Sequence, residues 1–152
     1  MKVHIIGPAG SGKTTLSARI VERGGGTAHD LDWIVYSEAG ERPIPEISRD
    51  LDSIIDQPSW VTEGAYRASW LQPVLDSADQ IIWLDLDWRV CVWRIFKRHV
   101  AAELARTNQH RGWRRMLGFM NYTRRIDGCS RVETAALLEA HATKVVRVTS
   151  LR

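Results

Sequence analysis

The residues that could do chemistry begin with a lysine and a threonine placed behind closely spaced glycines. The stretch Gly7-Pro8-Ala9-Gly10-Ser11-Gly12-Lys13-Thr14 fits the pattern G-x-x-x-x-G-K-[ST]. In this pattern the glycines let backbone amides turn inward around phosphate oxygens, the lysine reaches the β and γ phosphates, and the hydroxyl binds Mg²⁺. The spacing predicts a phosphate-binding loop, here called the P-loop, over residues 7–14, with ATP and Mg²⁺ as cofactors. The candidate nucleotide-binding residues are Gly7, Ala9, Gly10, Ser11, Gly12, Lys13, Thr14 and Thr15.

Two carboxylates and an indole follow a short extended piece at residues 27–31. They are Asp30, Asp32 and Trp33, and we expect them at the end of the second strand of a parallel sheet. Ligands of such sheets bind outside the carboxyl ends of the strands, so these side chains would face the same crevice as the P-loop. One carboxylate could orient Mg²⁺ through water and the other could accept a proton from an attacking hydroxyl. The alternative is a solvated turn with an aspartate cap.

A second acidic turn, Glu63-Gly64-Ala65-Tyr66-Arg67, closes the next strand in the same way. A glycine there allows a ligand to approach the backbone closely, and the arginine could hold an anion. The candidate metal ligands are Thr14, Asp32 and Glu63. The candidate acceptor-binding residues are Asp30, Asp32, Trp33, Gly64, Tyr66 and Arg67, with Trp33 and Tyr66 available to stack on a ring.

Arg94 and Arg98 are spaced i, i+4 on a predicted helix and therefore share one face of it. Two arginines on one face could stabilise the charge of a transferring phosphoryl group, which makes Lys13, Asp32, Arg94 and Arg98 the candidate catalytic residues. We expect an adjacent apolar stripe to pack inward: Val90, Trp93, Phe96, Val100 and Leu104. A solvated helical face is the simpler alternative for the arginine pair.

Charge is concentrated in the same region of the chain. Residues 89–131 contain eleven Arg or Lys and two acidic residues, a net charge of +9, whereas the whole chain carries +3. A basic segment beside an acidic remainder suggests a polyanion partner, either the phosphates of a small ligand or a nucleic-acid backbone.

These residues need a scaffold of alternating strands and helices. The pattern predicts strands at 2–6, 60–62, 80–86 and 145–149. It predicts helices at 13–23, at 46–56, from residue 88 onward and at 113–126. A last helix begins with a capping box at Ser130 to Glu133 and ends near residue 141. The segment between the short extended piece and residue 46 is expected to be a polar loop. Such alternation implies an α/β fold with a parallel sheet and helices on both faces.

Composition is that of one globular domain over residues 1–152. No apolar run approaches the roughly 20 residues that cross a bilayer, and the first strand runs directly into the glycines with no signal-peptide pattern. We expect a cytoplasmic protein with no membrane partner. Cys91 and Cys129 have no metal-ligand spacing and are expected to be free thiols.

With these motifs in view, the chain resembles the adenylate-kinase-like P-loop proteins, and within them the group called DNA topology modulation proteins. The resemblance is carried by GPAGSGKT, by Leu31-Asp32-Trp33, by EGAY at residues 63–66, by IIWLDLDWRVCVWRIFKR and by the terminal ALLEAH and KVVRVTS. It implies a three-layer α/β/α fold with a five-stranded sheet in the order 2-3-1-4-5, and a short lid or arginine-rich segment around residues 99–125.

The resemblance also implies roles for single residues. Glu63, Gly64 and Arg67 look like the series that binds the acceptor phosphate in nucleoside monophosphate kinases, although Glu63 replaces the usual Asp. Arg94 and Arg98 look like the arginine pair before the lid, and Asp30 and Asp32 are similar to the DxD of shikimate-kinase-like enzymes.

Three functions remain open at this point. The first is transfer of the ATP γ-phosphoryl group to a small acceptor, which could be a nucleotide, a nucleoside or a hydroxylated metabolite. The second is nucleotide-dependent association with nucleic acid, which the interleaving of the arginines with predicted core positions disfavours. The third is an ATPase switch that has no acceptor.

Overall fold

A computed structural model describes residues 1–104, 118 and 128–150, and its centre is a five-stranded parallel sheet. The strands are β1 (Lys2–Ile6), β2 (Thr27–Asp30), β5 (Trp60–Gly64), β6 (Gln80–Leu84) and β7 (Val145–Val148). They lie in the order β2-β5-β1-β6-β7. Since β3 and β4 belong to a separate hairpin, this is the order 2-3-1-4-5 when only the strands of this sheet are counted. The predicted parallel α/β sheet is confirmed.

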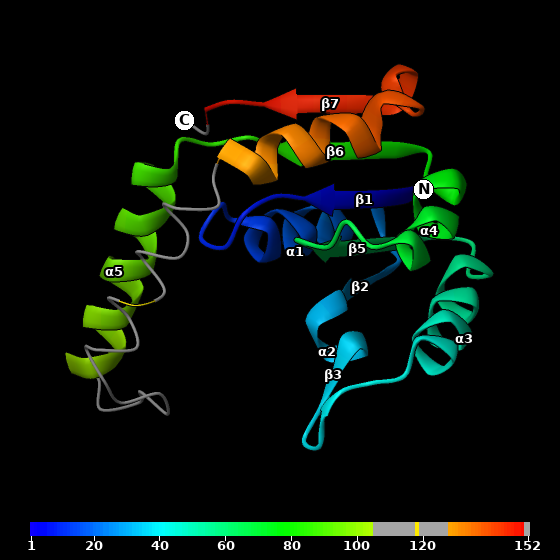
Figure 1. Ribbon diagram of the computed structural model, residues 1–152, viewed down its shortest axis with the longest axis horizontal. Helices are drawn as coiled ribbons and strands as arrows, with labels where there is room; N and C mark the ends of the chain where they lie inside the picture. The colour runs from blue at the N-terminus through cyan, green and yellow to red at the C-terminus, as the bar shows by residue number, and fades with distance from the viewer. Residues whose placement is uncertain (105–117, 119–127, 151–152) are drawn as a thin grey trace.

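Side-chain alternation along the strands builds a separate core on each face of the sheet. Val3 and Ile5 of β1 pack with Leu16 and Ile20 of α1 (Lys13–Gly24) on one face. Ile6, the next residue, belongs to the larger cluster on the opposite face. That cluster includes residues of α3 (Ile44–Ile55), α4 (Gln72–Ser77) and the helix at 128–139. Figure 1 shows the resulting layers, with helices on both sides of the sheet.

The segment after β2 was predicted as a polar loop, and this prediction is wrong. It contains the short helix α2 (Leu31–Val35) and a two-stranded hairpin, β3 (Tyr36–Ser37) with β4 (Gly40–Glu41). Asp30 is the N-cap of α2, because its carboxylate accepts a hydrogen bond from the backbone amide of Asp32 at 2.9 Å. Asp32 and Trp33 therefore lie in a helix rather than at the end of the second strand.

The two predicted helices in the first half of the chain are confirmed with small shifts at their ends. The helix predicted at 13–23 extends to Gly24, and the helix predicted at 46–56 begins at Ile44. Pro43 caps the latter, and a proline also stands in its first turn, where a missing amide hydrogen costs nothing. The one-turn helix η1 (Ser69–Leu71), α4 and the one-turn helix η2 (Ala142–Lys144) were not predicted.

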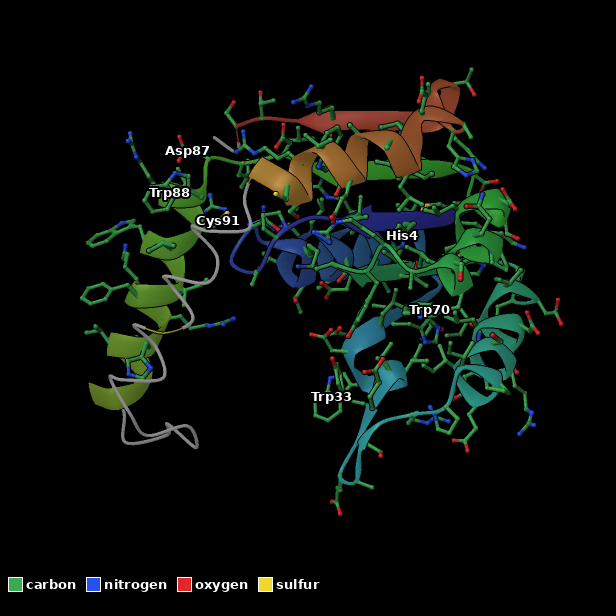
Figure 2. All side chains as sticks on the ribbon, viewed as in Figure 1. His4, Trp33, Trp70, Asp87, Trp88 and Cys91 are labelled. Carbon is green, nitrogen blue, oxygen red and sulfur yellow. The ribbon has the colours of Figure 1, made fainter. Side chains whose placement is uncertain are left out.

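The helix after β6, α5 (Trp88–Leu104), is confirmed, but the predicted inward stripe is wrong. Trp93 is 58% exposed and Val90 is 41% exposed, whereas Cys91, Val92 and Ile95 are buried. Figure 2 shows Cys91 on the side of α5 that faces the loop after β1. Because α5 carries large apolar residues on several sides, the 3.6-residue period fits more than one orientation of the helix.

The predicted capping box at residues 130–133 is also wrong. These residues lie inside a helix that already spans 128–139, and Ser130 and Glu133 both contact Arg67 instead of capping a helix end. The predicted helix at 113–126 and most of the predicted lid lie outside the described residues.

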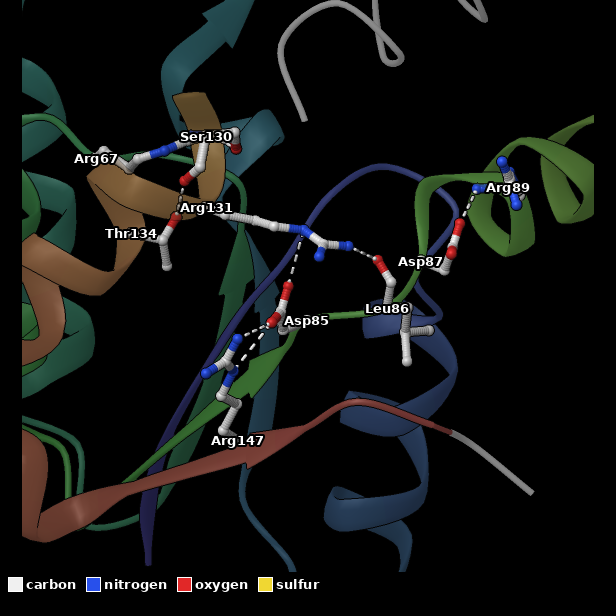
Figure 3. Close-up of polar contacts among 9 residues, drawn as sticks. All are labelled: Arg67, Asp85, Leu86, Asp87, Arg89, Ser130, Arg131, Thr134 and Arg147. Atoms are coloured by element: carbon white, nitrogen blue, oxygen red, sulfur yellow. Dashed lines mark hydrogen bonds and ion pairs between the residues drawn. The ribbon is translucent and has the colours of Figure 1, made fainter. Parts of the chain in front are cut away.

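A buried carboxylate joins the end of the sheet to the helix at 128–139 (Figure 3). Asp85 follows β6 and is almost fully buried. Its Oδ1 lies 3.1 Å from Nε of Arg131, and its Oδ2 accepts a hydrogen bond from Nε of Arg147 in β7 at 2.9 Å. Arg131 also donates to the backbone oxygen of Leu86 at 2.9 Å. Asp85 thus holds the segment that leads from β6 into α5.

Both cysteines are free thiols in the structure, as predicted, with Cys91 buried and Cys129 exposed. Among the helices within the described ranges, none combines the length and the apolar character that crossing a bilayer requires.

The ion pairs of Asp85 generate a stability prediction. We expect Asp85→Asn to lower the free energy of unfolding by about 2 kcal/mol, the usual scale for losing hydrogen bonds to a charged group. Urea unfolding followed by circular dichroism measures the change. Asp52→Asn is the control, because Asp52 is an exposed carboxylate on α3 and its replacement is expected to change stability by less than about 0.5 kcal/mol. Equal effects of the two substitutions would contradict the structural role of Asp85.

Candidate functional site

The P-loop follows β1 and is held between β5, β6 and α5. Two of its glycines have the positive φ values that other residues avoid, 78° for Gly10 and 97° for Gly12. A Cβ atom on Gly10 would lie only 2.6 Å from the backbone oxygen of Cys91 in α5. The loop therefore packs directly on the first turns of α5, and this close approach requires glycine.

The helix that follows the P-loop begins without a side-chain cap. Gly12 is the N-cap of α1, and the first turn of the helix contains no acidic residue. The first amides of a helix lack partners within the helix and carry its positive end, so they favour an anion. The Ser11 hydroxyl beside them is buried and has no hydrogen-bond partner among the described residues. These groups fit the phosphates of a nucleotide.

A cleft of about 470 Å³ opens between the P-loop with α1 and the inner side of α5. Arg94 crosses from α5 to the loop and donates from Nη1 to the backbone oxygen of Ser11 at 3.1 Å. Arg98, one turn further along α5, lines the same cleft. The predicted pair of arginines is therefore brought together with the predicted loop. The lining residues are Gly10, Gly12, Lys13, Thr14, Thr15, Leu16, Arg19, Arg94, Ile95 and Arg98.

Arg19 is a candidate site residue that the sequence analysis missed. It lies in α1 and lines the cleft beside the two arginines of α5. The sequence could have predicted this position, because Arg19 stands four residues after Thr15 in the helix and so shares a helical face with it. The cleft thus combines three guanidinium groups with the amine of Lys13.

Lys13 also lies among carboxylates. Burial lowers the pKa of its amine, while the negative charges of Glu63, Asp32 and Asp30 act in the opposite direction. The amine donates to the backbone oxygen of Pro8 at 3.1 Å, which folds the side chain back over the P-loop. Lys13 therefore lines the arginine-rich cleft and is also affected by the charges of the acidic residues at the ends of β2 and β5 and in α2.

Glu63 lies within β5, which extends two residues beyond the predicted strand to Gly64, and it is buried, with 3% of its surface exposed. Burial raises the pKa of its carboxyl group, and hydrogen bonding with Thr14 and Ser17 together with the charge of Lys13 counteracts that rise. The Ser17 hydroxyl lies 3.4 Å from Glu63 Oε1. The structure thus brings two predicted metal ligands, Thr14 and Glu63, to one point at the start of α1.

A histidine in β1 was also missed as a neighbour of this site. His4 is fully buried, as Figure 2 shows by its place in the central strand, and its Nδ1 hydrogen-bonds with the Thr62 hydroxyl at 2.9 Å. Burial, aided by the positive charge of Lys13, lowers the pKa of His4 to about 3. The imidazole is therefore neutral at physiological pH and adds no positive charge beneath the P-loop.

The acidic residues after β2 are tied to the turn after β5. The Tyr66 hydroxyl donates to Asp32 Oδ1 at 2.6 Å, and the Tyr66 ring lies 5.2 Å from the ring of Trp70. Burial and this hydrogen bond raise the pKa of Tyr66, so it stays a neutral donor. Tyr66 therefore positions Asp32.

Trp33 is 83% exposed on α2, and Figure 2 shows it at the periphery of the molecule.

Gly64 and Arg67, the other two residues predicted on this side, lie in contrasting surroundings. A Cβ on Gly64 would lie 3.0 Å from the Tyr66 ring and 3.1 Å from the Leu31 side chain, so the position favours glycine because neighbouring side chains crowd it. Arg67 donates to the backbone oxygen of Ala65 at 2.7 Å and to the Ser130 hydroxyl. Its Nε lies 3.5 Å from the Glu133 carboxylate.

The donor set agrees with Mg²⁺ more than with a transition metal. No group of three or more His, Cys, Asp or Glu side chains within the described ranges is arranged to hold a metal ion. Mg²⁺ does not need such a cage, since it usually binds through one or two carboxylates, waters and the phosphates of its nucleotide. Thr14, Glu63 and Asp32 carry oxygen atoms of the type that Mg²⁺ prefers, so the predicted ligand set fits this ion.

Comparison with known proteins shows the fold. No family model matches the chain, and no curated protein sequence matches it. The crystal structure of a gluconokinase from Sinorhizobium meliloti 1021 is similar to the chain, with a TM-score of 0.50 and 16% sequence identity. The match covers 80% of this chain and 73% of that chain. The likeness therefore shows that the chain shares the α/β fold of that gluconokinase.

Proposed function

We propose that the protein is a P-loop kinase that transfers the γ-phosphoryl group of ATP to a small acceptor in the presence of Mg²⁺. The observation that carries the proposal is that Lys13 of the P-loop lines one cleft with Arg94 and Arg98, and the negative charges of Glu63, Asp32 and Asp30 act on its amine from the other side of the site. Phosphoryl transfer needs positioning and charge neutralisation more than covalent catalysis, and this arrangement supplies both.

The nucleotide side of the proposed site is the P-loop with its cleft. Amides of the P-loop and the start of α1 would surround the phosphates, and Lys13 would reach the β and γ phosphates. Arg94 and Arg98 would stabilise the charge that spreads over the transferring group, with Arg19 beside them in the cleft. Arg94 is already held at the loop by its hydrogen bond to Ser11.

The acceptor side is formed by the residues after β2 and β5. In the transfer step, the acceptor hydroxyl oxygen bonds to the γ phosphorus while the bond to the bridging oxygen of ADP breaks. The proton of that hydroxyl passes to a carboxylate, for which Asp32 is the candidate because Tyr66 fixes its orientation. Thr14, with Glu63 or Asp32, would hold Mg²⁺, which neutralises phosphate charge when bound.

A second candidate function is nucleotide-dependent association with nucleic acid, as the likeness to DNA topology modulation proteins suggests. One observation favours it: Trp93 is exposed on α5, stacked on Phe96 at 5.7 Å between ring centroids, and Arg89 and Lys97 are exposed on the same helix. Against it, Arg94 turns into the cleft and Arg131 pairs with buried Asp85. Neither arginine contributes to an open basic surface.

Lysine replacement tests the proposed kinase. We expect Lys13→Ala to lower ATP turnover by about 100-fold or more, the scale for removing one group that stabilises transition-state charge. ADP release in the presence of a pool of candidate acceptors measures turnover, and a fluorescent nucleotide measures binding. Lys97→Ala is the matched control, since Lys97 is an exposed lysine of α5 outside the cleft lining. Unchanged turnover and unchanged nucleotide affinity in Lys13→Ala would contradict the proposal.

The raised pKa of Glu63 gives a second test. An acid whose pKa is higher in the folded state destabilises the fold when it is ionised, and this cost disappears as pH falls through the folded pKa. We expect Glu63→Gln to reduce Mg²⁺-dependent turnover by about tenfold or more. The same change should remove the gain in stability that the wild type shows as pH is lowered from 7 toward 5.

Thermal unfolding at several pH values, with turnover measured in parallel, separates these two effects. Glu22→Gln serves as the control, because Glu22 is an exposed glutamate of α1. Loss of the pH-dependent gain in stability without loss of turnover in Glu63→Gln would assign Glu63 a purely structural role.

Salt dependence separates the kinase from the nucleic-acid alternative. If the exposed face of α5 binds nucleic acid, affinity for duplex or single-stranded DNA should fall steeply as salt rises, and Arg89→Ala with Lys97→Ala should reduce the slope. We expect the binding of DNA to be too weak to measure at physiological salt.

The ATPase switch makes a different prediction. ATP hydrolysis at the same rate with and without every acceptor tested would favour it.

A further inference from the structure

We infer that the phosphoryl acceptor is a hydroxyl compound that carries no acidic group, such as an uncharged or amino-substituted polyol, because Arg67 is already occupied by Glu133 and Ser130. This inference rests on the proposed kinase function and narrows its substrate class. It runs against the role that sequence resemblance gives Arg67, which is to bind an acceptor phosphate.

Two nitrogens of the Arg67 guanidinium donate hydrogen bonds within the protein, and the third, Nε, is buried without a hydrogen-bond partner among the described residues and is paired with Glu133 by charge alone. Nη1 donates to the backbone oxygen of Ala65 at 2.7 Å, Nη2 donates to the Ser130 hydroxyl, and Nε lies 3.5 Å from Glu133 Oε2. Figure 3 shows Arg67 directed at Ser130 in the helix at 128–139. An acceptor phosphate or carboxylate would compete for this cation with the Glu133 carboxylate, which is 66% exposed, and with the Ser130 hydroxyl.

The arginine that contacts α2 is engaged in the same manner. Arg42 donates to the backbone oxygen of Ile34 at 2.9 Å and to Asp50 Oδ2 at 2.7 Å, and its Nε lies 3.4 Å from Glu46. Its charge is therefore balanced by two carboxylates. Neither Arg67 nor Arg42 therefore offers a guanidinium without a carboxylate beside it.

What this side presents to an acceptor is acidic and aromatic. Asp30 ends β2 and Asp32 lies in α2, the Tyr66 hydroxyl donates to Asp32, and the indole of Trp33 is exposed one residue later. Carboxylates accept hydrogen bonds from hydroxyl and ammonium groups, whereas a second anion beside them is repelled. An exposed indole also attracts a cationic group. The side chains thus favour hydroxyl and amine groups over acids.

The test uses one six-carbon skeleton in several charge states. The acceptors are glucitol, glucose, glucosamine, gluconate and glucose 6-phosphate, each with Mg²⁺ and ATP, and kcat/KM is measured from ADP release. We expect the uncharged or amino compounds to exceed gluconate and glucose 6-phosphate by about tenfold or more, as like-charge contact costs more than 1.4 kcal/mol. Preference for either acid would overturn the inference and leave the kinase proposal standing.

A binding experiment decides the question even if none of these compounds is phosphorylated. AMP is titrated by calorimetry into the protein whose P-loop is filled with a non-hydrolysable ATP analogue and Mg²⁺. We expect no saturable AMP binding below about 1 mM for the wild type, and at least about tenfold tighter binding for Glu133→Gln combined with Ser130→Ala, which frees Arg67. Glu139→Gln is the control, an exposed glutamate of the same helix.

The outcomes separate the inference from the proposed function. Tight AMP binding by the wild type, or no gain in the double variant, overturns the inference. Failure of the ATP analogue to bind overturns the kinase proposal instead. A double variant with unchanged thermal stability and increased AMP affinity supports the claim that Glu133 and Ser130 exclude acidic acceptors.

Discussion

A side chain at position 10 would collide with the backbone of α5, and most of the candidate site depends on that contact. The Cβ of any other residue would lie 2.6 Å from the Cys91 oxygen and 2.8 Å from the Ile95 side chain. With glycine there, α5 lies against the P-loop and Arg94 reaches the Ser11 carbonyl. The first turns of α5 and the start of α1 then enclose one cleft, in which guanidinium groups stand beside a helix start that has no side-chain cap. A loop displaced outward by even one methyl group would separate these charges, and their combined field on a phosphate would weaken.

The second organising feature is the separation of charge around Lys13. Arg19, Arg94 and Arg98 line the cleft that Lys13 shares, whereas the carboxylates of Glu63, Asp32 and Asp30 are its anionic neighbours. A chain with a net charge of only +3 thus places strong local fields of opposite sign within one site. Burial keeps His4 neutral beneath the loop, so the positive field comes from side chains that face the cleft and not from the core.

The parts of the fold and site that sequence could predict are those set by local rules. The parallel strands appear as apolar runs covered on both faces, and the P-loop appears through its spacing, because each residue there has a separate physical task. The side of α5 that faces inward could not be predicted, since Trp93 and Cys91 both fit an apolar stripe and only packing on Gly10 chooses between them. The helix α2 was missed because five residues give too short a window for periodicity. Arg19 was missed although its spacing from Thr15 was visible.

Arg67 shows why a matching motif does not by itself fix a residue's role. Locally, Glu63, Gly64 and Arg67 have the types and spacing of an acceptor-binding turn, and Ser130 with Glu133 has the spacing of a helix cap. Both patterns are satisfied by local chemistry alone, yet the fold brings the two segments together across 63 residues of sequence. Where the two segments meet, Arg67 forms an ion pair with Glu133. Arg67 is then less available to an acceptor anion, and Glu133 does not cap a helix. In the proposed kinase, the specificity of the acceptor side would therefore depend on a tertiary contact, since the same Arg67 would be available to an anion in a fold that kept the helix at 128–139 away from it.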